Sequence, residues 1–204
     1  MMQLTALQLK EKDPKRYEKE LCNHYPDHEW WDFIESDFTE QVFHMGVRVD
    51  SIYFEERYGW TAGFNGRLTI APWMQSQKLD EKWYPMWVAF AQDGGYVRVS
   101  NNNHRNNRRS GFSLDWNDNI AYTTPEGVFS DMGPQDWEDM LQEQLEQSGI
   151  YSLIEDWITD QGHELATRLQ ETYEYETSEE NFLEMCEANE ITFDYEGDDD
   201  EVPA

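Results

Sequence analysis

Residues 150–173 read IYSLIEDWITDQGHELATRLQETY, and their apolar positions return every three or four residues. This spacing predicts one amphipathic helix, because residues three and four apart lie on the same face of an α-helix. The apolar stripe consists of Ile150, Ile154, Trp157, Ile158, Leu165 and Leu169. We expect a bend near Gln161-Gly162, and we expect the stripe to cover one face of a sheet.

The residues before this helix follow a different period, because apolar and polar side chains alternate there. A two-residue period is typical of strands. Asn65-Gly66 and Asp93-Gly94-Gly95 are turn-forming sequences, and each predicts a hairpin between two strands. We therefore expect an antiparallel sheet of four or five strands. The candidate strand segments lie at residues 47–64, 67–70, 83–91, 96–100 and 112–116.

Helix signals flank the predicted sheet on both sides. Asp13-Pro14 joins a capping residue to a first-turn proline, which predicts a helix over 15–23. A second apolar stripe ends at Gly46, a typical residue after a helix. It consists of Trp30, Trp31, Ile34, Phe38 and Val42. Beyond the sheet we expect a helix over 135–147, and Thr177-Ser178-Glu179-Glu180 has the pattern of a capping box that opens a short helix.

These patterns predict an α+β fold with a mostly antiparallel central sheet, N-terminal helices and an acidic C-terminal helical region. We expect one domain over residues 1–197, and its last strand over residues 191–195. Within it, residues 1–46 are predicted to be helical, 47–123 to form the sheet and 134–190 to form the acidic helices. Residues 198–204 are expected to be an acidic tail.

The charge of the chain is concentrated at one end. Residues 131–204 hold 24 Asp and Glu and one basic residue, Arg168, whereas residues 1–130 hold 19 acids and 14 bases. With 30 aromatic residues, the chain does not have the composition of a disordered acidic protein or of one adapted to high salt. A folded surface of fixed negative charge indicates a partner that is positive, although plain solvation of the acids is the competing interpretation.

The chain has no apolar run long enough for a membrane span and no pattern of a secretory signal at its first residues. Cys22 and Cys186 do not form a motif. We therefore expect a cytoplasmic protein without a disulfide, in which both thiols are small core residues.

Two stretches resemble an uncharacterised family of tailed-bacteriophage proteins. The N-terminal stretch, residues 29–70, matches in Trp30-Trp31-Asp32, Ile52-Tyr53-Phe54 and Gly63-Phe64-Asn65-Gly66-Arg67. The C-terminal stretch, residues 149–197, matches in Tyr173–Glu180, Glu187–Glu190 and Phe193. The Gly-Asp-Gly-rich segment of that family is absent here and is replaced by Glu55–Trp60. The resemblance implies a phage origin and carries no established activity.

Enzyme and metal sites have weak support in the sequence. His24 and His28 have the spacing of two zinc ligands on a helix, but Pro26 lies between them and His44 is remote. The acidic run Asp198–Glu201 lacks the ligand order of a calcium loop. Carboxylate pairs for glycoside hydrolysis stay open as an alternative, because their separation in space is not visible in a sequence. We expect no enzyme activity, no metal and no cofactor.

The only concentrated basic segment is Asn101–Arg109. Because the rest of the chain would repel a polyanion, this segment predicts a hairpin loop rather than a nucleic-acid site. Three arginines remain candidates for contacting an acidic patch on a partner or on a second copy, which is compatible with a homodimer: Arg105, Arg108 and Arg109.

The acidic helices favour mimicry of nucleic acid. Duplex DNA carries one charge per ~3.4 Å along each strand, and one outward acid per helical turn gives a charge every ~5.4 Å. Two or three such helices side by side approach the charge density of DNA. The acids predicted to lie off the apolar stripes and to bind a partner are Glu138, Asp139, Glu143, Glu146, Glu155, Asp156, Asp160, Glu164 and Glu171.

The sequence therefore predicts a phage-encoded inhibitor, not an enzyme, that covers the DNA- or RNA-binding surface of a host protein. A restriction, CRISPR or related defence nuclease is the expected target. The alternative is a phage accessory protein that binds a partner without mimicry and whose acids only keep it soluble.

Overall fold

The computed structural model describes residues 2–26, 29–56, 59–79, 96–102, 109–115 and 149–195, together with residues 139, 143 and 147. The chain divides into two compact units. Unit 1 consists of Met1–Asp32 and Leu169–Ala204, and unit 2 consists of Phe33–Arg168. The prediction of one domain over residues 1–197 stays a prediction, because two units that pack separately can still fold together.

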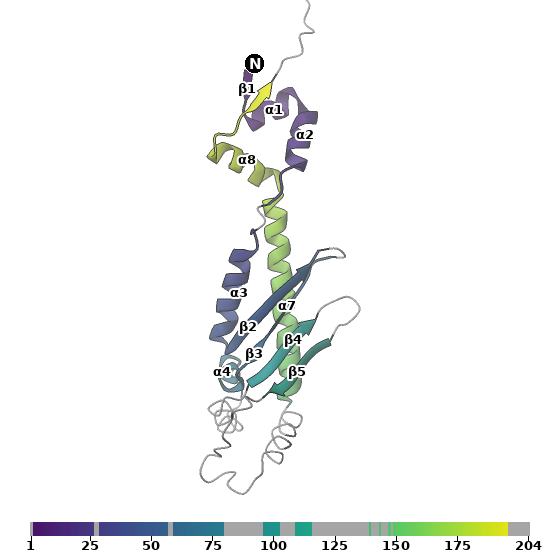
Figure 1. The fold of residues 1–204 in the computed structure, drawn as a ribbon, viewed down its shortest axis with the longest axis vertical. Coiled ribbons are helices and arrows are strands. Elements are labelled where there is room, and N and C mark those ends of the chain that lie inside the picture. The colour runs from purple at the N-terminus through teal and green to yellow at the C-terminus, as the bar shows by residue number, and fades with distance from the viewer. Residues whose placement is uncertain are drawn as a thin grey trace, which may run out of the picture. The chain divides into compact units, whose positions relative to one another are not determined.

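Unit 2 contains a four-stranded antiparallel sheet in the order β2-β3-β4-β5 (Figure 1). Its strands are β2 (Val47–Glu55), β3 (Thr61–Leu68), β4 (Tyr96–Asn102) and β5 (Arg109–Asp115). With the helices described below, this sheet confirms the predicted α+β class and its antiparallel centre. Every neighbouring pair follows the chain order, so the sheet is a simple meander.

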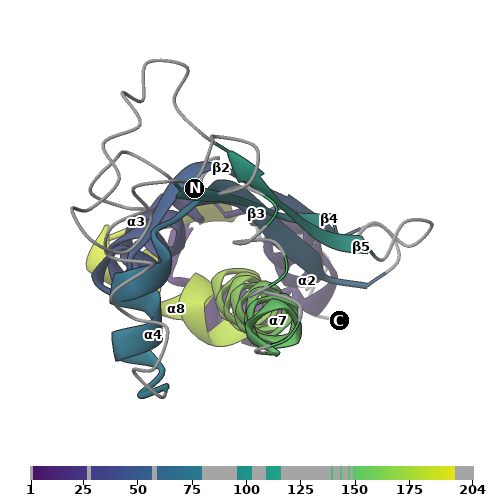
Figure 2. The same cartoon turned by 90° about the horizontal axis from the view of Figure 1, so that it is seen from below.

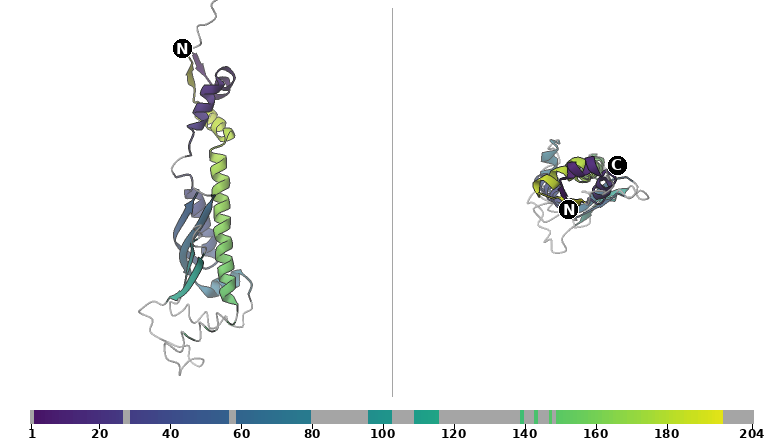
Figure 3. Two further views of the ribbon diagram at one scale, coloured as in Figure 1. Left: turned by 90° about the vertical axis from the view of Figure 1, so that its right-hand side faces the viewer. Right: turned by 90° about the horizontal axis from the view of Figure 1, so that it is seen from above.

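Helices α3 (Asp32–His44) and α7 (Ile150–Glu176) lie on the same side of this sheet (Figures 2 and 3). The buried Phe64 of β3 contacts both of them. Its ring centroid lies 5.3 Å from that of Phe38 on α3 and 6.5 Å from that of Trp157 on α7. Both apolar stripes therefore meet at one strand, as their helical spacing predicts.

The long helix α7 begins at Ile150 as predicted and continues to Glu176. It runs without interruption through Gln161 and Gly162, where the sequence predicts a bend, and both residues are buried. Residues 150–168 of this helix belong to unit 2 and residues 169–176 belong to unit 1.

The predicted turn at Asn65-Gly66 is wrong, because both residues lie inside β3. Gly66 has another role. A Cβ atom at Gly66 would lie 2.6 Å from the carbonyl oxygen of Arg48 on β2, beside a register shift between Val49 and Ser51. The glycine thus permits a close approach of two strands at an irregularity. The second predicted turn, Asp93–Gly95, and the strand candidate at residues 83–91 lie outside the described residues.

A short helix, α4 (Ile70–Ser76), follows β3 where the sequence predicts the end of a strand. Pro72 lies in its first turn, where a missing N–H costs little. Gly46 ends α3 as predicted and has a positive φ of 86°. Its carbonyl oxygen accepts from Thr69 N at 2.9 Å, so the end of α3 is tied to the start of α4.

Unit 1 joins the two ends of the chain. Strand β1 (Met2–Leu4) pairs antiparallel with β6 (Phe193–Tyr195), and helices α1 (Ala6–Lys12), α2 (Pro14–Cys22) and α8 (Glu179–Ala188) pack beside them. Strand β1 contradicts the prediction that residues 1–46 are helical, and α1 lies within that region although no separate helix was predicted for its residues. Helices α2 and α8 and strand β6 are confirmed. The buried core of this unit consists of Leu4, Ala6, Leu9, Tyr17, Phe182 and Cys186.

Two local predictions in unit 1 need correction. The capping box predicted over Thr177–Glu180 is displaced by one residue, because Ser178 rather than Thr177 is the N-cap of α8. The Ser178 hydroxyl accepts from Asn181 N at 3.1 Å, so the third helical residue is Asn181 and not an acid. Cys186 is buried as predicted. Cys22 is exposed, because it is the last residue of α2 and lies outside the core, and both cysteines are free thiols.

Candidate partner-binding surface

Four of the five acids predicted on α7 lie on its exposed side, away from the buried stripe. Asp156, Asp160, Glu164 and Glu171 are exposed, and Glu155 is partly buried at the edge of the helix. The first three follow one another at four-residue intervals, which places them about 6 Å apart along the helix axis. The exposed Leu153 lies one turn before Asp156 on the same side, with 44% of its surface accessible.

The acids predicted on residues 135–147 are described only in part. Asp139 and Glu143 have helical backbone and are exposed. The side-chain amide of Gln147 donates to Glu143 Oε1 at 2.6 Å, one helical turn away. Glu138 and Glu146 lie outside the described residues.

In unit 2 the structure places α3 beside α7, a pairing that the sequence analysis missed. The amide of Gln41 donates to Glu164 Oε1 at 3.5 Å, and Arg168 donates to Gln41 Oε1 at 3.3 Å. Arg168 also forms a salt bridge with Asp37. On α3, Gln41 lies one turn after Asp37. On α7, its partner Glu164 lies one turn before Arg168, which is the partner of Asp37. The two helices therefore run antiparallel with their polar edges in contact.

This contact creates a two-helix acidic surface. We call it the acidic face, and it consists of Asp37, Glu40, Asp156, Asp160 and Glu164. Within the described residues, Asp156 and Asp160 have no basic partner, whereas Arg168 is engaged by Asp37. The acids of α3 are visible in the sequence opposite the stripe of Ile34 and Phe38, but their position beside α7 is a long-range contact without a local signal.

Exposed aromatic side chains accompany the acids on α3. Phe33 and Phe43 are 76% and 64% accessible, and Ser36 and Glu40 lie between them along the outer side of the helix. Aromatic residues are enriched in protein interfaces, because they bury a large area at a low cost in side-chain entropy. The surface around α3 thus combines negative charge with apolar anchors.

The other face of the sheet carries a row of arginines. Arg48, Arg67 and Arg98 are exposed and lie directly opposite one another on β2, β3 and β4. Arg67 Nε donates to Asp50 Oδ2 at 3.3 Å, and its guanidinium lies 5.3 Å from the ring centroid of Tyr96. Like charges in direct register repel one another, and the salt bridge from Arg67 to Asp50 compensates part of this repulsion.

The predicted basic site lies in a different segment of the chain. Arg105 and Arg108 lie outside the described residues, and Arg109 begins β5. The alternation of apolar and polar residues could have predicted that these arginines lie on the exposed face. Arg67 precedes the buried Leu68, and Arg98 lies between the buried Val97 and Val99.

The described part of the chain holds no group of three His, Cys, Asp or Glu side chains that would bind a metal ion. His24 packs against Phe182 at 5.4 Å in unit 1, and His44 lies 4.0 Å from Glu40 on α3 in unit 2. His28 is outside the described residues. The expected absence of metal and cofactor stays a prediction. In the same described residues, no helix has the length and apolar character of a membrane span.

Comparisons of the chain with protein-family models, with curated proteins and with solved structures find no match.

Proposed function

We propose that this protein is a non-enzymatic inhibitor whose acidic face occupies the nucleic-acid-binding surface of a partner protein. The observation that carries the proposal is the contact between α3 and α7. It brings acids from two helices onto one surface, and it uses Arg168, the only basic residue among residues 131–204, as the connection between them.

The spacing of the acids supports a backbone mimic. Acids at four-residue intervals on α7 lie about 6 Å apart, and a second row on α3 raises the density toward the ~3.4 Å per charge of one DNA strand. Carboxylates present no base edges, so the partner would be a protein that grips the phosphate backbone rather than one that reads sequence. Such binding weakens with salt, because exposed charges are screened.

The resemblance of residues 29–70 and 149–197 to bacteriophage proteins supports a partner in a bacterial host. A phage-encoded inhibitor would act in the host bacterial cytoplasm, and a restriction, CRISPR or related defence nuclease is the partner whose inhibition benefits a phage. The protein itself would bind no nucleic acid, because its net charge of −28 repels a polyanion.

Charge reversal of the acidic face tests the proposal. The variant Glu40→Lys/Asp156→Lys/Asp160→Lys leaves the Asp37–Arg168 pair and the apolar stripes intact. The matched control Glu11→Lys/Glu18→Lys/Glu180→Lys makes the same change in charge at exposed positions of unit 1. Both proteins are assayed against a panel of purified restriction and CRISPR nucleases at low and high salt, with free DNA as competitor.

The proposal predicts that the wild type and the control inhibit at least one nuclease and that the acidic-face variant does not. Inhibition should fall steeply with salt and be relieved by DNA. An inhibition that survives the reversal, or no inhibition of any nuclease in the panel, would contradict it.

The arginine row favours a second candidate, an accessory module that binds an acidic partner without mimicry. Its carrying observation is the direct register of Arg48, Arg67 and Arg98. The variant Arg48→Glu/Arg98→Glu separates the two candidates. Loss of partner binding in this variant, with binding retained in the acidic-face variant, would favour the accessory module.

A further inference from the structure

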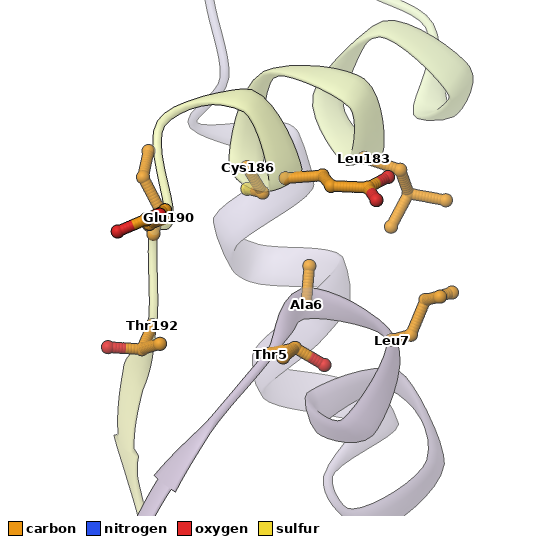
Figure 4. A pocket seen from close by; sticks show the side chains of 9 residues that line it. Thr5, Ala6, Leu7, Leu183, Cys186, Glu190 and Thr192 are labelled. Atoms are coloured by element: carbon orange, nitrogen blue, oxygen red, sulfur yellow. The ribbon is translucent and has the colours of Figure 1, made fainter.

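Unit 1 contains a pocket of about 430 Å³ between α1, α8 and the residues that lead into β6 (Figure 4). In Figure 4, Ala6 points toward α8, with Leu7 and Leu183 on one side and Glu190 and Thr192 on the other. The pocket is lined by Thr5, Ala6, Leu7, Leu183, Cys186, Glu187, Glu190, Ile191 and Thr192. Its volume lies in the range of small binding clefts.

The floor and walls of the pocket are apolar. Ala6 and Cys186 belong to the buried core, whereas Leu7 and Ile191 are 60% and 36% accessible. Exposed aliphatic side chains around a concave apolar floor indicate a surface that gains from being covered.

The end of α8 shapes the pocket. Ile191 N donates to Cys186 O at 2.8 Å, and Glu190 N donates to Glu187 O at 3.2 Å. This pair of bonds is a Schellman motif, in which the residue after the cap adopts a left-handed conformation. Glycine usually occupies that position, but here it is Glu190, with φ of 53°. The carboxylate of Glu190 therefore lies at the pocket even though the backbone conformation at this position favours glycine.

The polar side chains that line the pocket are two threonines and two glutamates. Glu187 and Glu190 are exposed carboxylates, and the described residues provide neither with a basic partner or a hydrogen bond to its side chain. The hydroxyl of Thr192 is already used, because it donates to Gln3 Oε1 at 2.7 Å. The free recognition groups are thus an apolar floor and two carboxylates.

We propose that this pocket binds a peptide segment of a partner protein in which an apolar side chain is followed closely by Lys or Arg. The apolar side chain enters between Leu7 and Ile191, and the basic residue pairs with Glu187 and Glu190. Charge complementarity selects this occupant, because the chain's own tail, with Asp198-Asp199-Asp200-Glu201, would be repelled by the same carboxylates. The pocket lies in unit 1, so this interaction does not depend on the acidic face of unit 2.

Fluorescently labelled twelve-residue peptides provide the probe. Each carries one Leu, Phe, Met or Trp in a Gly-Ser background, followed within four positions by two Lys, by two Glu or by two Ser. A further set has Ser in place of the apolar residue but keeps the Lys. Binding to the full chain is measured by anisotropy at physiological salt, because non-specific attraction of Lys to an acidic protein is weaker there.

Three variants locate the binding. Leu7→Ala removes an exposed wall, and Glu187→Gln/Glu190→Gln removes the charge. Glu180→Gln/Glu184→Gln removes two carboxylates from α8 outside the pocket lining and is the matched control. Cys186 lines the pocket but is only 3% accessible, so its thiol is alkylated only when the structure around it opens. A ligand bound to the closed pocket opposes that opening, so slower alkylation in a Cys22→Ser background supports binding there.

The expected result is that apolar peptides with Lys bind more tightly than all the others and slow the alkylation of Cys186. Glu187→Gln/Glu190→Gln should weaken only the Lys peptides, by about threefold to tenfold for two exposed ion pairs, and Leu7→Ala should weaken every apolar peptide. Equal binding of the Ser-Lys peptides, an equal effect of the control variant, or no protection of Cys186 would overturn the proposal.

Discussion

Arg168 of α7 forms a salt bridge with Asp37 of α3 and also donates to Gln41. Its side chain is 25% accessible, and that of Asp37 is 50% accessible. The one cation among residues 131–204 is therefore committed to holding two acidic helices together. It does not neutralise the outward-facing Asp156 and Asp160.

This arrangement predicts the effect of removing the pair. Arg168→Met should lower the free energy of unfolding by about 1 kcal/mol, because half-exposed ion pairs contribute little and the arginine stem also packs. In a double-mutant cycle with Asp37→Asn, the coupling energy should be about 0.5–1 kcal/mol. Urea denaturation of the four proteins measures it. A coupling energy of zero would show that the pair does not connect the helices.

In unit 1, the hydrogen bonds of Glu179 predict that the stability of the protein falls at acid pH. Glu179 accepts from Lys10 Nζ at 2.6 Å and from Tyr17 OH at 2.7 Å, and these bonds lower the pKa of Glu179 below its ordinary value of 4.5. A carboxylate whose folded pKa is lowered stabilises the fold above its unfolded pKa, and that stabilisation is lost as the pH falls. Glu179→Gln should therefore lose less stability than the wild type below about pH 4.5, as measured by thermal denaturation. The control Glu180→Gln should follow the wild type.

Tyr17 predicts a loss of stability at alkaline pH. Burial, and then its hydrogen bond to Glu179, raise the pKa of the Tyr17 hydroxyl well above its ordinary value of 10.0. The folded state favours the neutral phenol. The stabilisation that it gives to the fold is therefore fully present below pH 10 and is lost as the pH rises further. Above about pH 10, the Tyr17→Phe protein should lose less stability with rising pH than the wild type, as measured by thermal denaturation. Tyr25→Phe, at an exposed position, should leave this alkaline limb unchanged.

Local patterns predicted local structure well. The stripe of Ile34, Phe38 and Val42 and the cap at Asp13 depend only on residues within a few turns, and each is found in the structure. The short helix α8 is also found, but its cap is Ser178, one residue after the start of the predicted capping box. Asn65-Gly66 has the composition of a turn, yet its glycine is required by contact with Arg48 across the sheet. The composition of a dipeptide does not distinguish these two causes.

The spacing of apolar residues along the sequence does not predict contacts between residues that are far apart in the chain. Strand β1 is three residues long and gains its structure from pairing with β6, so that Leu4 lies opposite Phe193. The acidic face has the same origin. The periodicity correctly places Asp156, Asp160 and Glu164 off the apolar stripe of α7. Their neighbours on α3 are more than 100 residues away in the chain, as the 127-residue separation of Arg168 and Gln41 shows.

Gly66 permits a direct test of the close approach between β2 and β3. Gly66→Ala should destabilise the protein by about 1–3 kcal/mol, since the new methyl group would meet the backbone oxygen of Arg48 rather than a movable side chain. Asn65→Ala, one residue earlier, removes only an exposed hydrogen bond to Ser51 and should cost about 0.5–1 kcal/mol. Chemical denaturation compares the two. Equal costs would mean that the strands can separate to admit the methyl group.

Glu190 predicts a gain in stability. Its φ of 53° places a side chain in the left-handed region, which costs an L-residue roughly 1–2 kcal/mol relative to glycine. Glycine loses more conformational freedom on folding, so Glu190→Gly should raise the free energy of unfolding by a net amount of about 0.5–1 kcal/mol. The control is Asn189→Gly, because Asn189 has φ of −100° and its amide donates to Met185 O, so glycine there should destabilise. If the carboxylate of Glu190 serves the pocket, the Glu190→Gly protein will be more stable than the wild type and will bind the apolar peptides with Lys more weakly. A variant that is less stable than the wild type would show that the end of α8 does not have the Schellman geometry.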